Sequence, residues 1–267
     1  MQAGRPDAAG AAGPVPARDA GRAPARRPGR SVRRFIPPQH GAWAMLLVPY
    51  LAGLIVTGWR WPQLPLLVAW LAGYLLSFYA LQAVKTRRIQ RVRRQLLVYA
   101  AVAAAATAVV IAARPGVLAV APAYALLTAV NAYYAWRRRE RALVNDLALV
   151  VQSCLMVFLV AAVAGSAPTT VFGVFAVVLA YFTGTVLYVK TMIRERGNPA
   201  YRRWSVSYHW AAFGACAWLA PPVAVVFALL LARAWILPGR PVTPKHVGII
   251  EIVFCALLLT AIAVAWG

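Results

Sequence analysis

The amino-acid sequence predicts an all-α fold, a polytopic membrane helix bundle of about nine transmembrane helices. Three observations lead to this fold class. Of the 267 residues, 62% are hydrophobic and only 13% are charged, whereas a soluble domain is about 45–50% apolar and about 25% charged. The mean hydropathy is +0.67. Beyond residue 40 the chain consists of apolar runs close to the roughly 20 residues that a helix needs to cross the hydrocarbon core.

The first 34 residues differ in composition from everything that follows. They consist of Ala, Gly, Pro and Arg in irregular order, with eight Arg and two Asp. Such a segment cannot bury enough apolar surface to offset the entropy of ordering. We therefore expect a disordered basic cytoplasmic tail over residues 1–34 and a single transmembrane domain over residues 35–267.

Nine apolar runs are the candidate spans, and each is expected to be helical because a backbone in lipid must satisfy its own hydrogen bonds. The runs are Ala42–Gly58, Leu64–Val84, Leu96–Ala113, Val117–Trp136, Leu143–Gly165, Thr170–Ile193, Val206–Leu219, Pro222–Leu237 and Val247–Trp266. The seventh run is short and meets the eighth at Ala220-Pro221-Pro222. A re-entrant pair or one kinked hairpin is the alternative to two full spans at that point.

The distribution of basic residues predicts the orientation. With the N-terminus in the cytoplasm, 26 of the 28 Lys and Arg residues lie on the inner side, and only Arg60 and Arg114 lie outside. Cytoplasmic loops are enriched in Lys and Arg, so we predict a cytoplasmic N-terminus and an external C-terminus. The net charge of +22 is thereby explained by membrane topology. We expect membrane lipids as partners and no nucleic acid.

The sequence also indicates an internal repeat with an offset of 105 residues. The second predicted span ends in a Val-Lys-Thr that contains Lys85, and the sixth ends in the same three residues around Lys190. The offset also carries Asp146 onto Glu251. Each copy would contain four helices, which is an even number, so the two copies would be parallel repeats with the same orientation.

Ionisable residues inside the predicted spans are the first candidates for function, because charge in a membrane is costly. Asp146, Glu251 and His209 lie about one turn inside spans, and His40 stands at the entrance of the first. We expect these four to be the catalytic groups, as proton carriers or orienting groups. The structural alternatives are an ion pair of Asp146 with Arg139 or Arg141, an ion pair of Glu251 with Lys245, and a neutral buried His209.

Basic residues on the same predicted face are candidates for binding an anion, because Lys and Arg bind phosphate directly. The candidates are Lys85, Lys190, Arg194 and Arg141, and the supporting polar residues are Asn145, Glu195 and Gln39. Their structural alternative is a role as topology anchors. Asn131 and Gln152 are predicted to face each other across the fourth and fifth spans as an interhelical contact. No metal site is expected, because the three cysteines lie in apolar runs without CxxC spacing.

Three segments of the chain resemble the YwiC-like family of bacterial membrane proteins. They are FIPPQHGAWAML (Phe35 to Leu46), RRRERALVNDLA (Arg137 to Ala148) and YVKTMIRERGN (Tyr188 to Asn198). The resemblance covers Phe35 to Gly267. It implies one continuous unit in the plasma membrane of a bacterium.

The architecture is similar, more loosely, to that of UbiA-type prenyltransferases. That likeness implies two Asp-rich motifs at the cytoplasmic ends of the second and sixth spans, which hold magnesium and a prenyl diphosphate. The equivalent stretches here, VKTRRIQRVRR and YVKTMIRERGN, contain a single carboxylate, Glu195. Magnesium is therefore expected only if the chain is prenyltransferase-like.

Three functions remain open from the sequence. The first is a UbiA-like membrane protein whose cytoplasm-facing pocket binds an amphipathic anion such as a prenyl or lipid phosphate. The second is a membrane scaffold or assembly factor without catalysis, in which the polar residues are structural. The third is a small proton-coupled transporter that uses Asp146 and Glu251.

Overall fold

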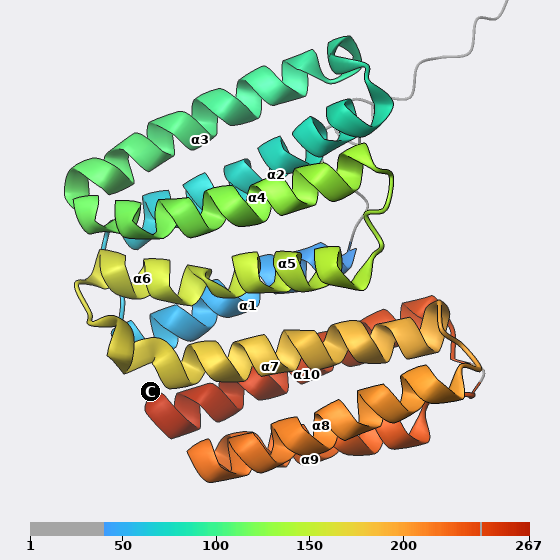
Figure 1. Cartoon of the computed structure of the whole chain (residues 1–267). Coiled ribbons are helices and arrows are strands. Elements are labelled where there is room, and N and C mark those ends of the chain that lie inside the picture. The colour runs from blue at the N-terminus through green and yellow to red at the C-terminus, as the bar shows by residue number, and fades with distance from the viewer. Residues whose placement is uncertain (1–39, 241) are drawn as a thin grey trace, which may run out of the picture. The chain divides into compact units, whose positions relative to one another are not determined.

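The computed structural model describes residues 40–240 and 242–267 (Figure 1). These residues form ten α-helices and two 3-10 helices. The elements are α1 (His40–Thr57), α2 (Gln63–Thr86), η3 (Ile89–Arg91), α3 (Arg93–Ala113), η4 (Pro115–Val120), α4 (Ala121–Trp136), α5 (Leu143–Cys154), α6 (Met156–Ala164), α7 (Pro168–Ile193), α8 (Pro199–Leu219), α9 (Pro221–Ile236) and α10 (Pro244–Trp266). The predicted tail, residues 1–34, lies outside the described residues, as do Gln39 and the side chain of His40.

The described helices make nine rods, because α6 continues α5 after Leu155 and α4 continues η4. Six of the rods are long and apolar enough to cross a membrane. The first and eighth, Ala42–Thr57 and Pro221–Ile236, are shorter and also apolar. The predicted all-α membrane bundle is therefore confirmed. Figure 1 shows the rods lying side by side with their connections at two opposite ends.

Helix α8 begins earlier than the sequence predicted. Asn198 caps the helix, since its side chain accepts hydrogen bonds from the backbone N–H groups of Ala200 and Tyr201, and the helix starts at Pro199 rather than Val206. His209 consequently lies ten residues after the start of α8. Helices α8 and α9 pack on each other as a helical hairpin joined at Ala220.

The C-terminal helices form a closed bundle. Helix α7 contacts α8, α9 and α10, while α9 contacts both α8 and α10. The largest apolar core extends from this bundle to α1, α5 and α6, with Val150, Phe182 and Phe227 among its buried members. In the N-terminal half, α3 packs mainly on α2 and η4. A helix that faces lipid needs no polar outer surface, which suits the alanine-rich sequence of α3.

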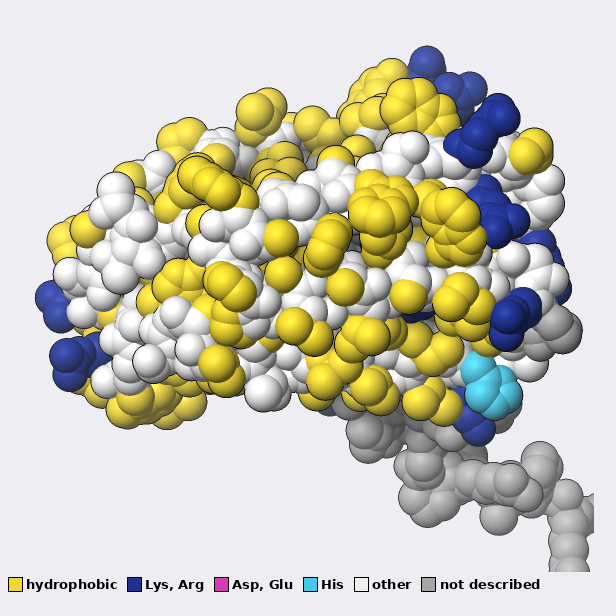
Figure 2. All heavy atoms as spheres, turned by 90° about the horizontal axis from the view of Figure 1, so that it is seen from below, with side chains coloured by type: hydrophobic (Ala, Val, Ile, Leu, Met, Phe, Trp, Pro, Cys, Tyr) yellow, Lys and Arg dark blue, Asp and Glu magenta, His cyan; other side chains and the backbone are white. Residues whose placement is uncertain are grey.

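Charged residues gather at one end of the rods, which we call the basic end. This end carries the loops of residues 87–92, 137–142, 194–198 and 237–243. Apart from Arg60 and Arg114, every described Lys and Arg lies in these loops or in the adjoining helix ends. Figure 2 shows most of the Lys and Arg side chains of the visible face at one end of the molecule. The four carboxylates of the described residues, Glu140, Asp146, Glu195 and Glu251, belong to the same end.

The helix bounds match the 105-residue offset. Helix α2 begins at Gln63 and α7 at Pro168, while α3 begins at Arg93 and α8 at Pro199. The contacts correspond as well, because α8 contacts α7 and α9 as α3 contacts α2 and η4. The 105-residue offset is therefore accompanied by a similar pattern of helix contacts.

Candidate functional site

The last turn of α7 meets the first turn of α5 in a cluster at the basic end, which we call the Lys190 cluster. The Lys190 ammonium lies 2.7 Å from the Asp146 carboxylate, and Arg194 lies 4.0 Å from the same oxygen. Lys190 also donates a hydrogen bond of 2.9 Å to the backbone carbonyl of Arg141. Asp146 thus pairs with α7 and not with Arg139 or Arg141, the partners of the structural alternative. Three of the four predicted anion-binding residues do lie here.

Lys85, at the end of α2, forms a second and more exposed ion pair. Its partner is Glu140, which precedes Arg141 in the loop between α4 and α5. The Lys85 ammonium lies 2.6 Å from the Glu140 carboxylate, and half of the Lys85 side chain is exposed. The hydrogen bond from Lys85 lowers the pKa of Glu140 below its ordinary value. The Asn145 side-chain amide fixes this loop by donating to the Glu140 carbonyl at 2.7 Å. The two repeat lysines therefore bind adjacent residues, Glu140 and Arg141, of one loop.

A third group of charges is buried in the C-terminal bundle, and we call it the Arg233 cluster. Arg233 of α9 forms an ion pair with Glu251 of α10, and its side chain is only 3% exposed. The Thr185 hydroxyl of α7 donates to the other carboxylate oxygen at 3.0 Å. The Arg233 guanidinium lies 4.0 Å from the Tyr188 ring centroid and 4.8 Å from that of Phe254. The structural alternative from the sequence paired Glu251 with Lys245, and this alternative is wrong, because Glu251 is bound by Arg233.

Several buried polar atoms around the C-terminal bundle lack a hydrogen-bond partner among the described residues. Two belong to Arg233, whose Nε and Nη2 are both buried. His209 bonds through Nδ1 to the Ser205 carbonyl at 2.7 Å, while its Nε2 is buried without a partner. Gly184 leaves room for this ring, since a Cβ there would stand 3.1 Å from Nε2. Native proteins rarely leave such atoms unpaired, and those that are unpaired require an explanation.

The predicted site residues thus fall into separate groups. Asp146, Lys190 and Arg194 come together, whereas Lys85 and Glu251 each have their own partners. Glu195 accepts a hydrogen bond of 2.9 Å from Asn198, the residue that caps α8. Sequence reasoning missed Arg233, Thr185 and Tyr188. A signal for Arg233 was available, because it lies inside the predicted span Pro222–Leu237.

The polar contact between α4 and α5 is as predicted. The Asn131 amide donates to the Gln152 side-chain carbonyl at 2.8 Å, and Gln152 donates to the Thr128 hydroxyl at 3.0 Å. This contact holds two helices together and contains no charged group. Among the described residues, no three His, Cys, Asp or Glu side chains are grouped so that they could hold a metal ion. The described residues therefore do not fit the magnesium that a prenyltransferase would need.

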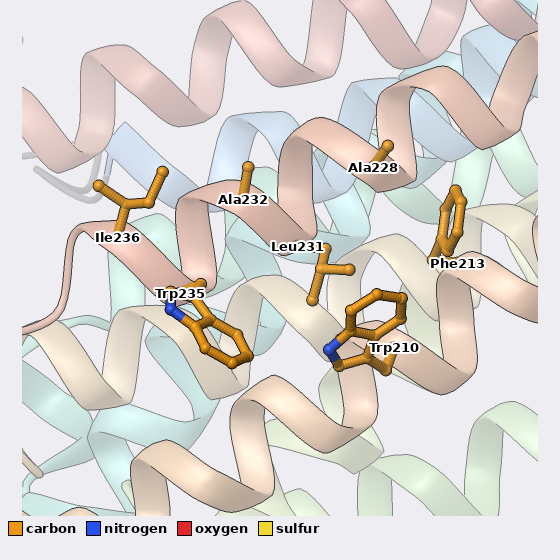
Figure 3. Close-up of a pocket in the computed structure, with 7 residues that line it drawn as sticks. All are labelled: Trp210, Phe213, Ala228, Leu231, Ala232, Trp235 and Ile236. Carbon is orange, nitrogen blue, oxygen red and sulfur yellow. The ribbon is translucent and has the colours of Figure 1, made fainter.

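Two open hollows lie on the outer face of α8, away from these clusters. The larger, about 350 Å³, is apolar and lies between α8 and α9 (Figure 3). Its lining residues are Trp210, Phe213, Ala228, Leu231, Ala232, Trp235 and Ile236. The second, about 250 Å³, is lined by Ala200, Arg203, Trp204 and Ser207. Neither hollow contains a residue that the sequence predicted for the site.

Comparison of the sequence with known proteins shows the family to which the chain is related. The family model described as YwiC-like protein matches residues 36–161. YwiC of Bacillus subtilis (strain 168) is 32% identical over 235 residues, which are 85% of this chain and 96% of that protein. A protein of Haemophilus influenzae is 29% identical over 245 residues, 88% of this chain and 99% of its own length. No solved structure matches the chain significantly. The chain belongs to the YwiC-like protein family.

Proposed function

We propose that this multi-pass protein lies in the bacterial plasma membrane with its N-terminus and basic end in the cytoplasm, and that it binds a lipid with a phosphate head group. The orientation is supported by the charge difference between the two ends of the rods, where Arg60 and Arg114 stand alone against four basic loops. Loops rich in Lys and Arg remain on the cytoplasmic side of the membrane. Anionic head groups on that side are attracted to such an end.

The observation that carries the lipid site is that the two hollows follow each other along α8. Ala200, Arg203, Ser207, Trp210 and Phe213 recur at intervals of three or four residues, so they lie on one face of the helix. The stripe runs from a cationic hollow near the basic end into an apolar hollow further along the helix. The hollow with Arg203 can bind an acidic head group, and the apolar hollow next to it can bind a hydrocarbon chain. Together they match a lipid that has both parts.

The ligand class is the one expected from the sequence, but the proposed seat is different. Lys85 and Lys190 are already bound to carboxylates, so a phosphate would have to displace Glu140 or Asp146. Arg203 lines an open hollow and has the Ser207 hydroxyl beside it. An arginine fork binds phosphate oxygens in pairs, which a lysine cannot do. Lys85, Lys190 and Arg194 then serve to join α2, α5 and α7 at the membrane surface.

Native mass spectrometry of the purified protein tests this site. Phosphatidylglycerol or a polyprenyl phosphate is added, with phosphatidylcholine as the uncharged comparison, and bound lipids are counted. The double variant Arg203→Gln/Trp210→Ala should weaken binding of the anionic lipid at least roughly tenfold, because it removes a charged hydrogen bond and the tail contact. The preferred anionic lipid identifies the source of the phosphate.

Matched controls are available at the same end and on the same helix. Arg88→Gln removes an exposed charge between α2 and α3, and Trp218→Ala removes a tryptophan of α8 that is 89% exposed. Both should bind the anionic lipid as the unmodified protein does. Equal loss in all variants, or no loss in the double variant, would overturn the proposed seat.

A second function, proton-coupled transport, is supported by one specific observation. The buried Arg233–Glu251 pair and His209, ten residues inside α8, place ionisable groups well within the C-terminal bundle. Paired ionisable groups of this kind mark proton relays in transporters. Proton uptake by liposomes, followed with an enclosed pH dye after addition of inorganic phosphate, should be lost in Glu251→Gln and kept in Arg88→Gln. A protein that moves no protons under a phosphate gradient is not such a transporter.

A further inference from the structure

The Arg233 guanidinium leaves one of its hydrogen-bonding edges unused inside the bundle. Glu251 binds the Nη1 atom, while Nε and Nη2 are buried and have no partner among the described residues. We infer that this Nε–Nη2 edge is a seat for a small oxyanion, either a carboxylate or a phosphate. The inference goes beyond the lipid site on α8 and does not rest on it.

The shape of the guanidinium decides the class of ligand. Nε and Nη2 lie on the same edge of the planar group, and their N–H bonds point in nearly the same direction. Two parallel donors of this kind match the two oxygens of a carboxylate, or two oxygens of a phosphate, in a bidentate pair. A single water molecule has one oxygen and satisfies such a fork less well than a planar oxyanion does.

The surroundings of Arg233 hold this edge in place. The Tyr188 and Phe254 rings lie 4.0 Å and 4.8 Å from the guanidinium carbon, so aromatic contacts restrain the plane of the group. Glu251 is in turn held by the Thr185 hydroxyl at 3.0 Å. The donor edge is therefore pre-organised, and a bound anion would lose little freedom of the protein side chains. The Tyr188 hydroxyl is a further buried group that has no hydrogen-bond partner within the described part of the chain.

The desolvated donors of the cluster also favour an anion. The Arg233–Glu251 pair has no net charge, but the Nε and Nη2 atoms are desolvated and have no acceptor among the described residues. Buried donors of a charged group are costly to leave unsatisfied. Arg233 lies three residues before the end of α9 at the basic end, which at 1.5 Å per residue is roughly 5 Å along the helix axis. The seat is thus close to the side from which anions would arrive.

The experiment measures how small anions stabilise the full-length protein in detergent. Sodium acetate and sodium phosphate are titrated separately against chloride at constant ionic strength, and the thermal midpoint is followed by tryptophan fluorescence. The unmodified protein should show a saturable rise of the midpoint with at least one of the two anions. A rise with acetate indicates a carboxylate site, and a rise with phosphate indicates a phosphate site.

Three variants separate an anion seat from a purely structural ion pair. Arg233→Lys keeps the charge but loses the fork, and its apparent affinity should fall roughly tenfold. Glu251→Gln removes a negative charge that repels an anion at the neighbouring edge, so the anion-dependent rise of the thermal midpoint should be larger than in the unmodified protein. The double variant Arg233→Leu/Glu251→Leu removes both charges together and should fold without any anion response. It keeps the test decisive if Arg233→Lys does not fold.

Arg114→Lys is the matched control, because Arg114 lies at the opposite end, where its Nε donates to the Val163 carbonyl at 3.1 Å. The thermal midpoint of Arg114→Lys should rise with acetate or phosphate as it does in the unmodified protein. An identical anion response in Arg233→Lys, or no response to either anion in the unmodified protein, would overturn the inference. Loss of phospholipid binding in the Arg203 variants would leave it untouched, because that experiment uses a different ligand on another surface.

Discussion

Two helix junctions at repeat-equivalent positions use different chemistry. Between α4 and α5 the contact is a neutral amide pair, with Asn131 and Gln152 at 2.8 Å. Between α9 and α10 it is the ion pair of Arg233 and Glu251. Moving the first pair by 105 residues places Ile236 and Leu257 at its positions. The second junction thus has apolar residues at the positions of the amide pair and a buried charge pair elsewhere.

The two repeat-equivalent carboxylates show the same difference. Asp146 of α5 is bound by Lys190 of α7 near the basic end, and 22% of its side chain is exposed. Glu251 of α10 is bound by Arg233 of α9 within the bundle, and 14% of its side chain is exposed. Thr128 stands in α4 at the position equivalent to Arg233, so the first copy has no cation on that helix for Asp146.

Burial differs from one pair of counterpart helices to the next. In the most apolar window of each helix, 39% of the residues of α7 are buried, against 17% for its counterpart α2, whereas α5 and α6 together are 44% buried, against 28% for their counterpart α10. The charge pair of the second copy is therefore not explained by tighter packing of that copy as a whole. It depends on the local contact of α9 with α10, where Arg233 and Glu251 neutralise each other.

Breaking the ion pair of the second copy should have the largest effect. Arg233→Leu leaves Glu251 as an uncompensated buried charge, which should lower the free energy of unfolding by about 3–5 kcal/mol. The measurement is unfolding by sodium dodecyl sulfate in mixed micelles. Replacing both residues by Leu should restore most of the stability. A double variant as unstable as the single one would show that the pair itself, and not the lone charge, stabilises the bundle.

Breaking the amide pair of the first copy should cost much less. Asn131→Ile alone removes the donor to the Gln152 side-chain oxygen, while the Gln152 bond to Thr128 remains. It should lower the stability by about 0.6 kcal/mol, and by no more than about 1.7 kcal/mol. The same detergent titration measures it.

Asn131→Ile combined with Gln152→Leu installs the residues of the second copy and should be nearly neutral. A loss in this double variant as large as that of Arg233→Leu would contradict the difference between the two junctions.

The helices and their ends could be predicted from the sequence because hydrophobic length alone decides where a chain crosses lipid. The predicted boundaries of Leu143–Gly165 and Thr170–Ile193 lie close to the observed α5–α6 and α7. The start of α8 was missed, because Arg202, Arg203 and the serines near them lower the hydropathy of its first turns. A helix cap at Asn198 extends the helix in spite of that composition.

The candidate site could be predicted only in part, since spacing along the sequence does not say which helices become neighbours. Asp146 and Lys190 were both identified, but their contact depends on α5 packing against α7. Arg233 was overlooked because positive charge near the cytoplasmic end of a span is normally explained by topology. Its direction toward Glu251 follows from the packing of α9 on α10, which no periodicity in a uniformly apolar helix reveals.

The ion pairs of Lys85 and Lys190 differ in exposure, and breaking the more exposed pair should have the smallest effect on stability. Lys190 is 10% exposed and Lys85 is 50% exposed, although both bind the loop of residues 137–142. An exposed pair is screened by solvent, so Glu140→Gln should reduce the stability by only about 0.2–1 kcal/mol at pH 7. The hydrogen bond from Lys85 lowers the pKa of Glu140 in the folded protein. The contribution is therefore complete above the ordinary carboxyl pKa and disappears as the pH falls through the lowered folded value. The thermal midpoints of Glu140→Gln and of the unmodified protein should differ slightly at pH 7 and converge in acid. A difference that grows in acid would contradict an ion pair.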